Sequence, residues 1–549
     1  MESTGLTDKQ TTVRASILSR WLVIASALVT ISFLSSVVLL SQGKVFQSPD
    51  ETANRIFTET FANSGALWYE NNLLQLDAEN LLHPRGVLTH DGRAVPFNFL
   101  GVPVIYGAIS TVVGDQIKYI AILFAIITVF ALCKGAGELF GCRAEDSLAV
   151  IAGCTPLLYY FNRPFMNALP AITFFSLGIW LLVRYVKRSS TRSLICASVA
   201  LSAAMFFRYE YALFGAAIVG VAVLQRHDAI LAKVALHDLA IAATVVAAIF
   251  LIPVLVLNQY VYGSWSTYGY GLFQHAYYPS EDSHAPVLIR GLGGVTSILV
   301  PSTPHVGTIA RNLLRFTLLL VPVLSILSLT AGVNIVRGRQ VRIRTLGLSV
   351  LIMLYFVSYR GASDTWAAGG FRPNFDAAIV RYWLPMYLAM FFLAAFAMHT
   401  VNDRFLKGML VALMMACSVV TLGWRYDGNL MAIRETLSRE QAWSEDVLSH
   451  ATEEDAIVYS GRADKRVVPF RYSAAWWNGE EFYDPVLVAR SMARVHAAGY
   501  RVYVVQEREV DLEQLNNELS KYGLVAIQAK RGRIFAIHPI ERLESATPR

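Results

Sequence analysis

The sequence predicts a polytopic α-helical membrane protein with a small soluble α/β domain at its C-terminal end. Of the 549 residues, 55% are hydrophobic and only 16% are charged, whereas about 25% of the residues of an ordinary globular domain are charged. The apolar residues are gathered into runs close to the ~20 residues that a helix needs to cross a bilayer core. Residues 425–549 instead have the mixed composition of a soluble domain.

Charge and cysteine usage exclude several other classes of protein. The formal net charge of +7 is modest for this length, so we interpret it as a topology signal and predict no nucleic-acid partner. No zinc-finger spacing, Walker loop or GxGxxG motif after a strand is present. The five cysteines form no CxxC pair and lie in or beside apolar runs. Neither a disulfide framework nor a thiolate metal site is therefore indicated.

The first apolar run, residues 21–40, follows a short arm (residues 1–20) that carries Lys9, Arg14 and Arg20. A signal peptide also begins with a basic arm, but this run is as long as a full span and no small-residue cleavage site follows it. We predict an uncleaved anchor whose N-terminal arm is cytoplasmic, by the positive-inside rule.

Eleven further apolar runs follow the polar segment 41–96, and together with the anchor they predict a bundle of about 11–13 helices. They cover residues 97–113, 117–140, 148–161, 165–186, 194–207, 211–224, 239–260, 313–336, 346–358, 382–399 and 405–424. Basic segments at 187–192, 226–233 and 337–344 mark cytoplasmic loops. Counting outward from them places the loops 261–310 and 360–380, and the C-terminal domain, outside the cytoplasm.

This count contains a parity conflict. If every run crossed, the C-terminal domain would return to the cytoplasm. We expect the run 97–113 to lie at the interface or to re-enter, because it is short and contains Pro103 and Gly107; such backbone needs cover from protein or from a water-filled cavity. The predicted transmembrane domain is then residues 21–424, with 41–96 as the first extracytoplasmic loop.

The C-terminal residues 425–549 are predicted to form an extracytoplasmic α/β domain. Short β-rich runs lie at 456–459, 502–506 and 533–538, and helical spacing covers 488–498 and 512–522. Alternating strands and helices favour a small three-layer or two-layer domain. It contains no catalytic triad or metal motif, so we expect it to have a packing role or to dock an acceptor, and not to carry out the chemistry.

The first outer loop begins with Ser48-Pro49-Asp50-Glu51, which places two adjacent carboxylates just outside the membrane. One interpretation is helix capping, because Ser48 or Asp50 suits the start of a helix and acidic residues suit its positive end. The other interpretation is catalysis by a carboxylate. The two are compatible, since a capping carboxylate keeps one oxygen free.

Pro-Asp-Glu-Thr directly after a first transmembrane helix resembles the first outer loop of the GT-C superfamily of integral-membrane glycosyltransferases. The resemblance is to the protein O-mannosyltransferase and lipid A aminoarabinose transferase group, of the glycosyltransferase family 39 type. Further similar segments follow in family order at 82–86, 96–101, 163–170, 207–210, 258–270 and 381–385. The resemblance covers residues 21–424 and implies a GT-C-like transmembrane core.

The resemblance also implies a reaction: a hexosyl or pentosyl group moves from a polyprenyl-phosphate or dolichyl-phosphate donor to a glycan, lipid or protein acceptor. Asp50 is the expected general base, with Glu51 beside it, because an acceptor hydroxyl must lose its proton. Arg208, Arg381 and Arg163 are the expected donor-phosphate ligands, since a guanidinium group binds phosphate oxygens bidentately.

Five further side chains are expected to support these groups or to contact substrate: Glu210, His83, Asn167, Tyr382 and Tyr262. Asn167 occupies a position where the relatives usually carry an acid, and the segment 93–96 lacks an acid that the aminoarabinose group has. Metal dependence therefore cannot be carried over. No cofactor is assigned, and a divalent cation is left open as an alternative.

Each assignment has a structural alternative. Arg208 and Glu210 would also form an ion pair that anchors a helix end, and Arg163 and Arg381 would also snorkel from helix ends. His83 would also be an ordinary loop histidine, and the aromatic loop 260–278 suits a membrane interface as well as a sugar ring. For the whole chain, the alternatives are a transporter or flippase of lipid-linked sugars and an inactive GT-C-like assembly subunit. The sequence has no internal repeat, which argues against the transporter.

Overall fold

The structure is a computed structural model, and it describes residues 45–70, 86–188, 190–226, 233–269, 306–337, 378–425, 429–452, 455–460, 473–476, 485–505, 511–529 and 534–540, together with five isolated residues outside these ranges. The chain divides into two compact units. The helical unit comprises Met1–Leu40, Lys118–Val254 and Leu288–Ile433, and the mixed unit comprises Ser41–Ile117, Leu255–Val287 and Arg434–Arg549. The predicted anchor 21–40 and the run 346–358 lie outside the described residues, apart from Ile24 and Ile31.

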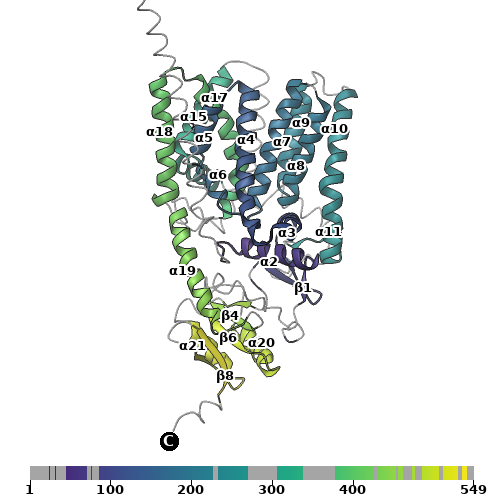
Figure 1. Cartoon of the computed structure of the whole chain (residues 1–549), viewed down its shortest axis with the longest axis vertical. Helices are drawn as coiled ribbons and strands as arrows, with labels where there is room; N and C mark the ends of the chain where they lie inside the picture. Colours follow the sequence, from purple (N-terminus) through teal and green to yellow (C-terminus); the bar gives the residue numbers. More distant parts are fainter. Residues whose placement is uncertain are drawn as a thin grey trace, which may run out of the picture. The chain divides into compact units, whose positions relative to one another are not determined.

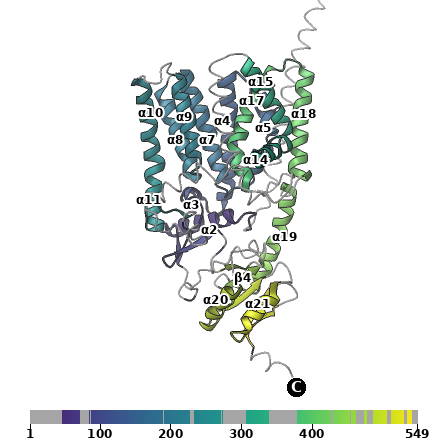
Figure 2. The same cartoon turned by 180° about the vertical axis from the view of Figure 1, so that it is seen from behind.

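The helical unit is a bundle in which α4, α7, α8, α9 and α10 run side by side (Figures 1 and 2). Its elements are α4 (Ile120–Phe140), α5 (Ala144–Ala152), α6 (Thr155–Tyr160), α7 (Ala168–Arg188), α8 (Thr191–Phe207), α9 (Tyr211–Arg226), α10 (Lys233–Val246), η2 (Ala247–Leu251), α14 (Val306–Leu313), η4 (Leu314–Leu319), α15 (Pro322–Arg337), η6 (Ala378–Trp383), α17 (Leu384–Thr400), α18 (Arg404–Val420) and η7 (Thr421–Arg425).

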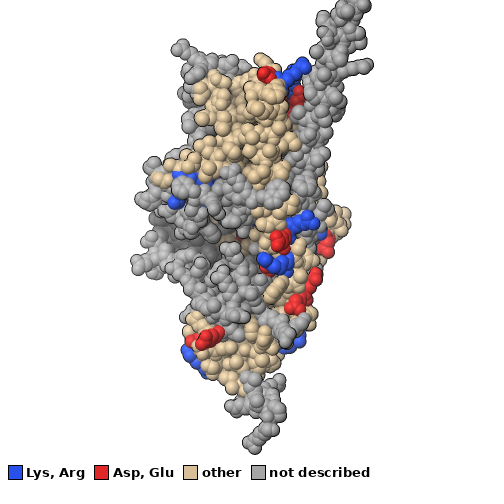
Figure 3. Space-filling model, turned by 90° about the vertical axis from the view of Figure 1, so that its left-hand side faces the viewer, with Lys and Arg blue, Asp and Glu red and all other residues tan. Residues whose placement is uncertain are grey.

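Five helical segments of the described residues are long and apolar enough to cross a membrane, and a sixth candidate is a bent pair, Ala310–Leu319 with Pro322–Asn334, whose halves meet at 107°. The five are Gly101–Phe140, Ala168–Arg188, Leu236–Tyr262, Val380–Thr400 and Arg404–Gly423. Apolar side chains such as Phe405, Met409 and Leu413 on α18 are exposed, and the described surface of this part of the bundle carries few charges below its upper edge (Figure 3). Such a face suits lipid tails.

The run 148–161 was expected to be one apolar helix, but it folds as two short helices, α5 and α6. Gly153 and Cys154 separate them, and Pro156 lies in the first turn of α6, where a proline is tolerated because its missing N–H would be unpaired anyway. The run 97–113 is helical as α3 (Gly101–Val113). That this run lies at the interface or re-enters the membrane stays a prediction.

The first part of the mixed unit packs α2 (Pro49–Ser64) and α3 with a three-stranded antiparallel sheet in the order β1-β3-β2. The strands are β1 (Tyr69–Glu70), β2 (Val87–His90) and β3 (Arg93–Pro96). Asp91 and Gly92 join β2 to β3 with φ angles of 48° and 78°, which is the left-handed conformation that an Asp-Gly hairpin turn requires. The hairpin brings segment 86–90 alongside segment 93–97.

The C-terminal part of the mixed unit is a three-layer α/β domain, as its alternating runs predict. Its five-stranded sheet has the order β5-β4-β6-β8-β7, in which β5, β4 and β6 are parallel and β8 is antiparallel to β6 and β7. The elements are α19 (Leu430–Leu448), β4 (Ala456–Ser460), β5 (Ser473–Trp476), α20 (Pro485–Ala497), β6 (Val502–Val505), α21 (Asp511–Ser520), β7 (Leu524–Gln528) and β8 (Ile534–Pro539). Strands β5 and β7 and helix α19 were not predicted.

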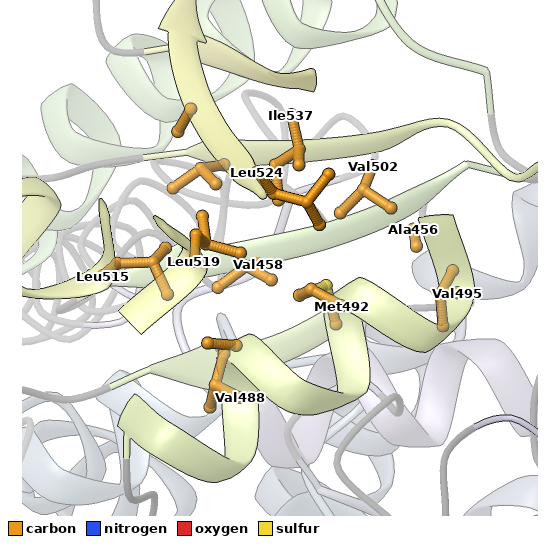
Figure 4. Close-up of a cluster of buried hydrophobic side chains, with 13 residues drawn as sticks. Ala456, Val458, Val488, Met492, Val495, Val502, Leu515, Leu519, Leu524 and Ile537 are labelled. Carbon is orange, nitrogen blue, oxygen red and sulfur yellow. The ribbon is translucent and has the colours of Figure 1, made fainter. Parts of the chain in front are cut away.

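Alternate residues of β4 and β6 bury on opposite faces of this sheet. Val458 and Val504 pack with Met492 of α20 and Leu519 of α21 on one face, as Figure 4 shows for Val458, Met492 and Leu519. Ile457, Val505 and their neighbours pack with Val447 at the end of α19 on the other face. Period-2 alternation with both faces covered is the pattern expected of a central strand between two helical layers.

Candidate active site

The acidic motif of the first loop forms the start of α2. Ser48 is the N-cap, with extended backbone angles, and its hydroxyl oxygen accepts a hydrogen bond from the Asp50 amide at 3.2 Å. Pro49 occupies the first turn, where its fixed φ suits a helix. The capping interpretation is thus confirmed for Ser48. Asp50 and Glu51 lie in the first turn, where the helix dipole stabilises negative charge.

The two carboxylates differ in their access to solvent. Asp50 is half-buried, whereas Glu51 is 0% exposed. A group that takes a proton from an incoming acceptor must be reachable by it. Of the two, Asp50 meets this condition, whereas Glu51 is enclosed in the packed first turn.

Gly86 holds the hairpin against this turn. Its φ of +87° is in the left-handed region, and a Cβ added there would lie 3.1 Å from the Pro49 carbonyl oxygen and 3.2 Å from the Ala53 Cβ. Glycine is therefore required twice, by conformation and by the close approach of the backbone. The hairpin and the start of α2 are consequently positioned as one piece.

Tyr262 and His90 connect the end of α11 (Ile252–Tyr262) to the hairpin. The Tyr262 hydroxyl donates to the Pro96 carbonyl oxygen at 2.8 Å, and the His90 Nε2 lies 3.0 Å from the Tyr262 carbonyl oxygen. Tyr262 is buried, so its phenol helps to fix the loop. Next to it, the exposed Tyr260 ring lies 4.5 Å from the Trp68 ring, and Arg93 lies over Trp68 at 4.8 Å.

The helical unit gathers the predicted arginines. Arg208 is the C-cap residue of α8 and pairs with Glu210, with its Nε 2.6 Å from Glu210 Oε1. The predicted ion pair is thus present. Arg163 lies in the loop between α6 and α7, and its Nη1 donates to the Tyr159 hydroxyl at 2.7 Å. Both arginines are 3% exposed, so neither snorkels into bulk solvent.

Tyr382 joins Arg208 to Arg381. Its ring lies 5.0 Å from the Arg208 guanidinium carbon and 5.3 Å from that of Arg381, distances at which a cation is attracted by the π-electrons of an aromatic ring. Arg381 and Tyr382 belong to η6, the 3₁₀ turn that leads into α17. Residues far apart in the sequence therefore meet at one place in the helical unit.

Tyr160, at the end of α6, interacts electrostatically with Arg163, Arg208, Arg381 and Tyr382. Tyr160 is buried, and all four side chains lie within electrostatic range of its phenol. We call Arg163, Arg208, Glu210, Arg381, Tyr382 and Tyr160 the arginine cluster. It contains three guanidinium groups and one carboxylate, so it carries an excess of positive charge. Sequence reasoning missed Tyr160, because a hydropathy scan counts the Tyr159-Tyr160-Phe161 run as apolar.

The remaining predicted residues fall outside this cluster. Asn167 is buried just before α7, and His83 lies outside the described residues. Within the part of the chain that the structure describes, no group of three His, Cys, Asp or Glu side chains could hold a metal ion. Asp50 and Glu51 belong to the mixed unit, and the arginine cluster belongs to the helical unit.

Comparison with known proteins bears on this arrangement. A family model described as dolichyl-phosphate-mannose-protein mannosyltransferase matches residues 104–256. The crystal structure of ArnT from Cupriavidus metallidurans in the apo state matches over 97% of this chain and 100% of its own, with 14% identity and a TM-score of 0.55. The same protein bound to undecaprenyl phosphate matches over 94% of this chain and 97% of its own, with 14% identity and a TM-score of 0.50. A search of curated protein sequences gives no significant match.

The chain is therefore a multi-pass integral membrane protein with a GT-C fold, which confirms the predicted fold class and the predicted resemblance. At 14% identity the likeness to ArnT is a likeness of fold.

Proposed function

We propose that this protein is a glycosyltransferase that moves a sugar from a polyprenyl-phosphate donor to an acceptor at the extracytoplasmic face of the membrane. The observation that carries the proposal is the arginine cluster. Charged groups in a membrane domain are costly, and they mark substrate sites when their charges are not balanced internally. A lipid-linked phosphate is an anion that reaches such a depth.

The reaction follows from the chemistry of the two sites. The acceptor hydroxyl oxygen forms a bond to the anomeric carbon while the bond from that carbon to the phosphate oxygen breaks, which inverts the configuration. Asp50 takes the hydroxyl proton. The phosphate keeps the electron pair of the broken bond, and the guanidinium groups of the arginine cluster stabilise its growing negative charge.

Two comparisons support the donor class. The ArnT structure with the same fold was determined bound to undecaprenyl phosphate, and the matching family model describes an enzyme that uses dolichyl-phosphate-mannose. The proposed topology has the N-terminus in the cytoplasm and the C-terminal α/β domain outside. The proposed sugar is a hexose or a pentose, and the proposed acceptor is a glycan, a lipid or a protein.

The test is transfer from a panel of radiolabelled polyprenyl-phosphate sugars by the full chain in reconstituted membranes, with native membranes as the acceptor source. Asp50→Asn should lower the rate by about 10²-fold or more, since general-base catalysis contributes typically 10²–10⁴-fold. Glu59→Gln is the matched control, because Glu59 is an exposed acid on the same helix and should leave transfer unchanged.

The outcomes separate the proposal from its rivals. Equal transfer by wild type and Asp50→Asn would remove Asp50 from the mechanism. Movement of intact lipid-linked sugar across the bilayer without bond cleavage would identify a flippase. Binding of donor without transfer, in the presence of every acceptor fraction, would indicate an inactive assembly subunit.

A further inference from the structure

Arg315 is a buried cation that the reaction described above does not use. It lies in η4, the π-helical turn next to the 107° bend between Ala310–Leu319 and Pro322–Asn334. The side chain is 3% exposed, and its Nε is buried without a hydrogen-bond partner. Its guanidinium carbon lies 5.3 Å from the ring of Phe316. No carboxylate of the described residues forms an ion pair with it.

A buried arginine without an ion-pair partner among the described residues is unusual. The guanidinium group stays charged in proteins, and an uncompensated buried charge strongly destabilises the fold. In a membrane domain such a charge is normally paired or serves a substrate. π-Helical turns are also rare and often occur at functional sites. The missing counter-charge is therefore most simply supplied by an anionic ligand.

The turn that carries Arg315 packs against the segment that presents two members of the arginine cluster, Arg381 and Tyr382. The Phe316 ring lies 5.4 Å from the ring of Trp383, which directly follows Tyr382 in the chain. The Tyr387 hydroxyl donates to the Phe316 carbonyl oxygen at 2.8 Å. Both partners belong to the segment of η6 and α17 that presents Arg381 and Tyr382.

A second contact fixes the other end of the turn. The Thr155 hydroxyl, in the first turn of α6, lies 3.5 Å from the Leu320 carbonyl oxygen. Tyr160 of the arginine cluster lies at the other end of the same short helix. The bend is thus held by two elements that also hold the cluster.

We propose that Arg315 binds the phosphate group of the polyprenyl-phosphate lipid, as a phosphate-positioning residue in addition to those of the arginine cluster. The inference rests on the proposed function for the identity of the lipid. The guanidinium fork donates to the phosphate oxygens, and the anion supplies the negative charge that the described residues do not provide at this turn.

The experiment measures binding of undecaprenyl phosphate to the full chain in nanodiscs, with undecaprenol and inorganic phosphate as comparison probes. Arg315→Gln should weaken undecaprenyl phosphate binding by about 10- to 100-fold, the loss expected for charge-assisted hydrogen bonds. Arg315→Lys should lose less, because it keeps the charge. Arg192→Gln, which changes an exposed arginine of α8, should bind as wild type does. All variants should bind undecaprenol with the affinity of the wild type, because it has no phosphate group.

A second readout separates ligand binding from a structural role. If Arg315 is unpaired without ligand, Arg315→Gln should melt at the same temperature as the ligand-free wild type or higher, and lipid phosphate should stabilise it less. A lower melting temperature for ligand-free Arg315→Gln would overturn the inference, because it would mean that Arg315 stabilises the fold. Equal lipid affinity for Arg315→Gln and wild type, with Arg208→Gln impaired, would overturn it while leaving the proposed function intact.

Two further results are decisive. Equal competition by inorganic phosphate and by undecaprenyl phosphate would replace the lipid by a free anion and so contradict the inference. If wild type binds no polyprenyl phosphate at all, the proposed function itself fails.

Discussion

The guanidinium carbon of Arg208 lies 5.0 Å from the ring centre of Tyr382, so the end of α8 and the turn before α17 meet through a cation and an aromatic face. Arg381, the neighbour of Tyr382, lies 5.3 Å from the same ring. One aromatic side chain therefore positions two positive charges that would otherwise repel each other.

The Tyr382 ring should matter more than its hydroxyl group. Tyr382→Phe keeps the aromatic face and should retain donor affinity within about threefold. Tyr382→Ala removes a cation–π contact worth about 2 kcal/mol when desolvated, which corresponds to about 30-fold. Donor titrations of the transfer rate would measure this as a raised KM. A Tyr382→Phe variant as impaired as Tyr382→Ala would show that the hydroxyl acts directly on substrate.

Glu210 should stabilise the protein chiefly when no ligand is bound. Its partner Arg208 is 3% exposed, and breaking a buried ion pair typically costs about 3–5 kcal/mol. Glu210→Gln should therefore lower the melting temperature of the ligand-free protein. Undecaprenyl phosphate should restore more stability to this variant than to wild type, because it replaces the lost negative charge. A thermal-unfolding series at increasing lipid concentration tests both statements.

Gly86 and Gly92 give a matched pair of substitutions in one hairpin. Both have a positive φ, of 87° and 78°, so alanine should cost each about 1–2 kcal/mol in backbone strain. A Cβ at Gly92 meets open space, whereas a Cβ at Gly86 meets the Pro49 carbonyl oxygen at 3.1 Å. Gly86→Ala should therefore also displace the turn that carries Asp50 and reduce kcat. If the two variants lose the same activity, the contact with Pro49 has no catalytic consequence.

The proposed topology has a direct test in cysteine labelling. In a background without native cysteines, Tyr500→Cys should react with a membrane-impermeant maleimide in intact cells, because Tyr500 is exposed in the C-terminal domain. Arg192→Cys, at the start of α8, should react only after permeabilisation, since it lies in a predicted cytoplasmic loop. The reverse pattern would invert the topology.

The fold class and the presence of buried arginines at helix ends could be predicted from the sequence, because both depend on strong local signals. Long apolar runs identify membrane helices, and an arginine at the end of such a run is conspicuous. Arg163, Arg208 and Arg381 have such positions and also lie in segments that resemble the GT-C superfamily, and all three interact electrostatically with Tyr160. The strands β4, β6 and β8 were found through their alternation of β-rich residues.

Other features depend on contacts between residues far apart in the sequence, or on weaker sequence signals. Tyr160 counted as one more apolar residue, and Arg315 was absorbed into the predicted span 313–336, although Pro322 in the same run marked a break. The β2–β3 hairpin has a sequence signal in Asp91-Gly92, but a dipeptide is a much weaker signal than a long apolar run. The proximity of Arg208 to Tyr382 could not be read from the sequence, since it depends on how α8 and α17 pack.

The alternation of β4 and β6 between two cores has a consequence for how the C-terminal domain can change in length. Val458 and Val504 face one core, and Ile457 and Val505 face the other. Inserting or deleting a single residue within either strand would exchange these side chains between the cores, whereas the same change in the connecting segments would leave both cores intact. Mutational drift in this domain should therefore preserve the spacing within β4 and β6 and accumulate length differences between the strands.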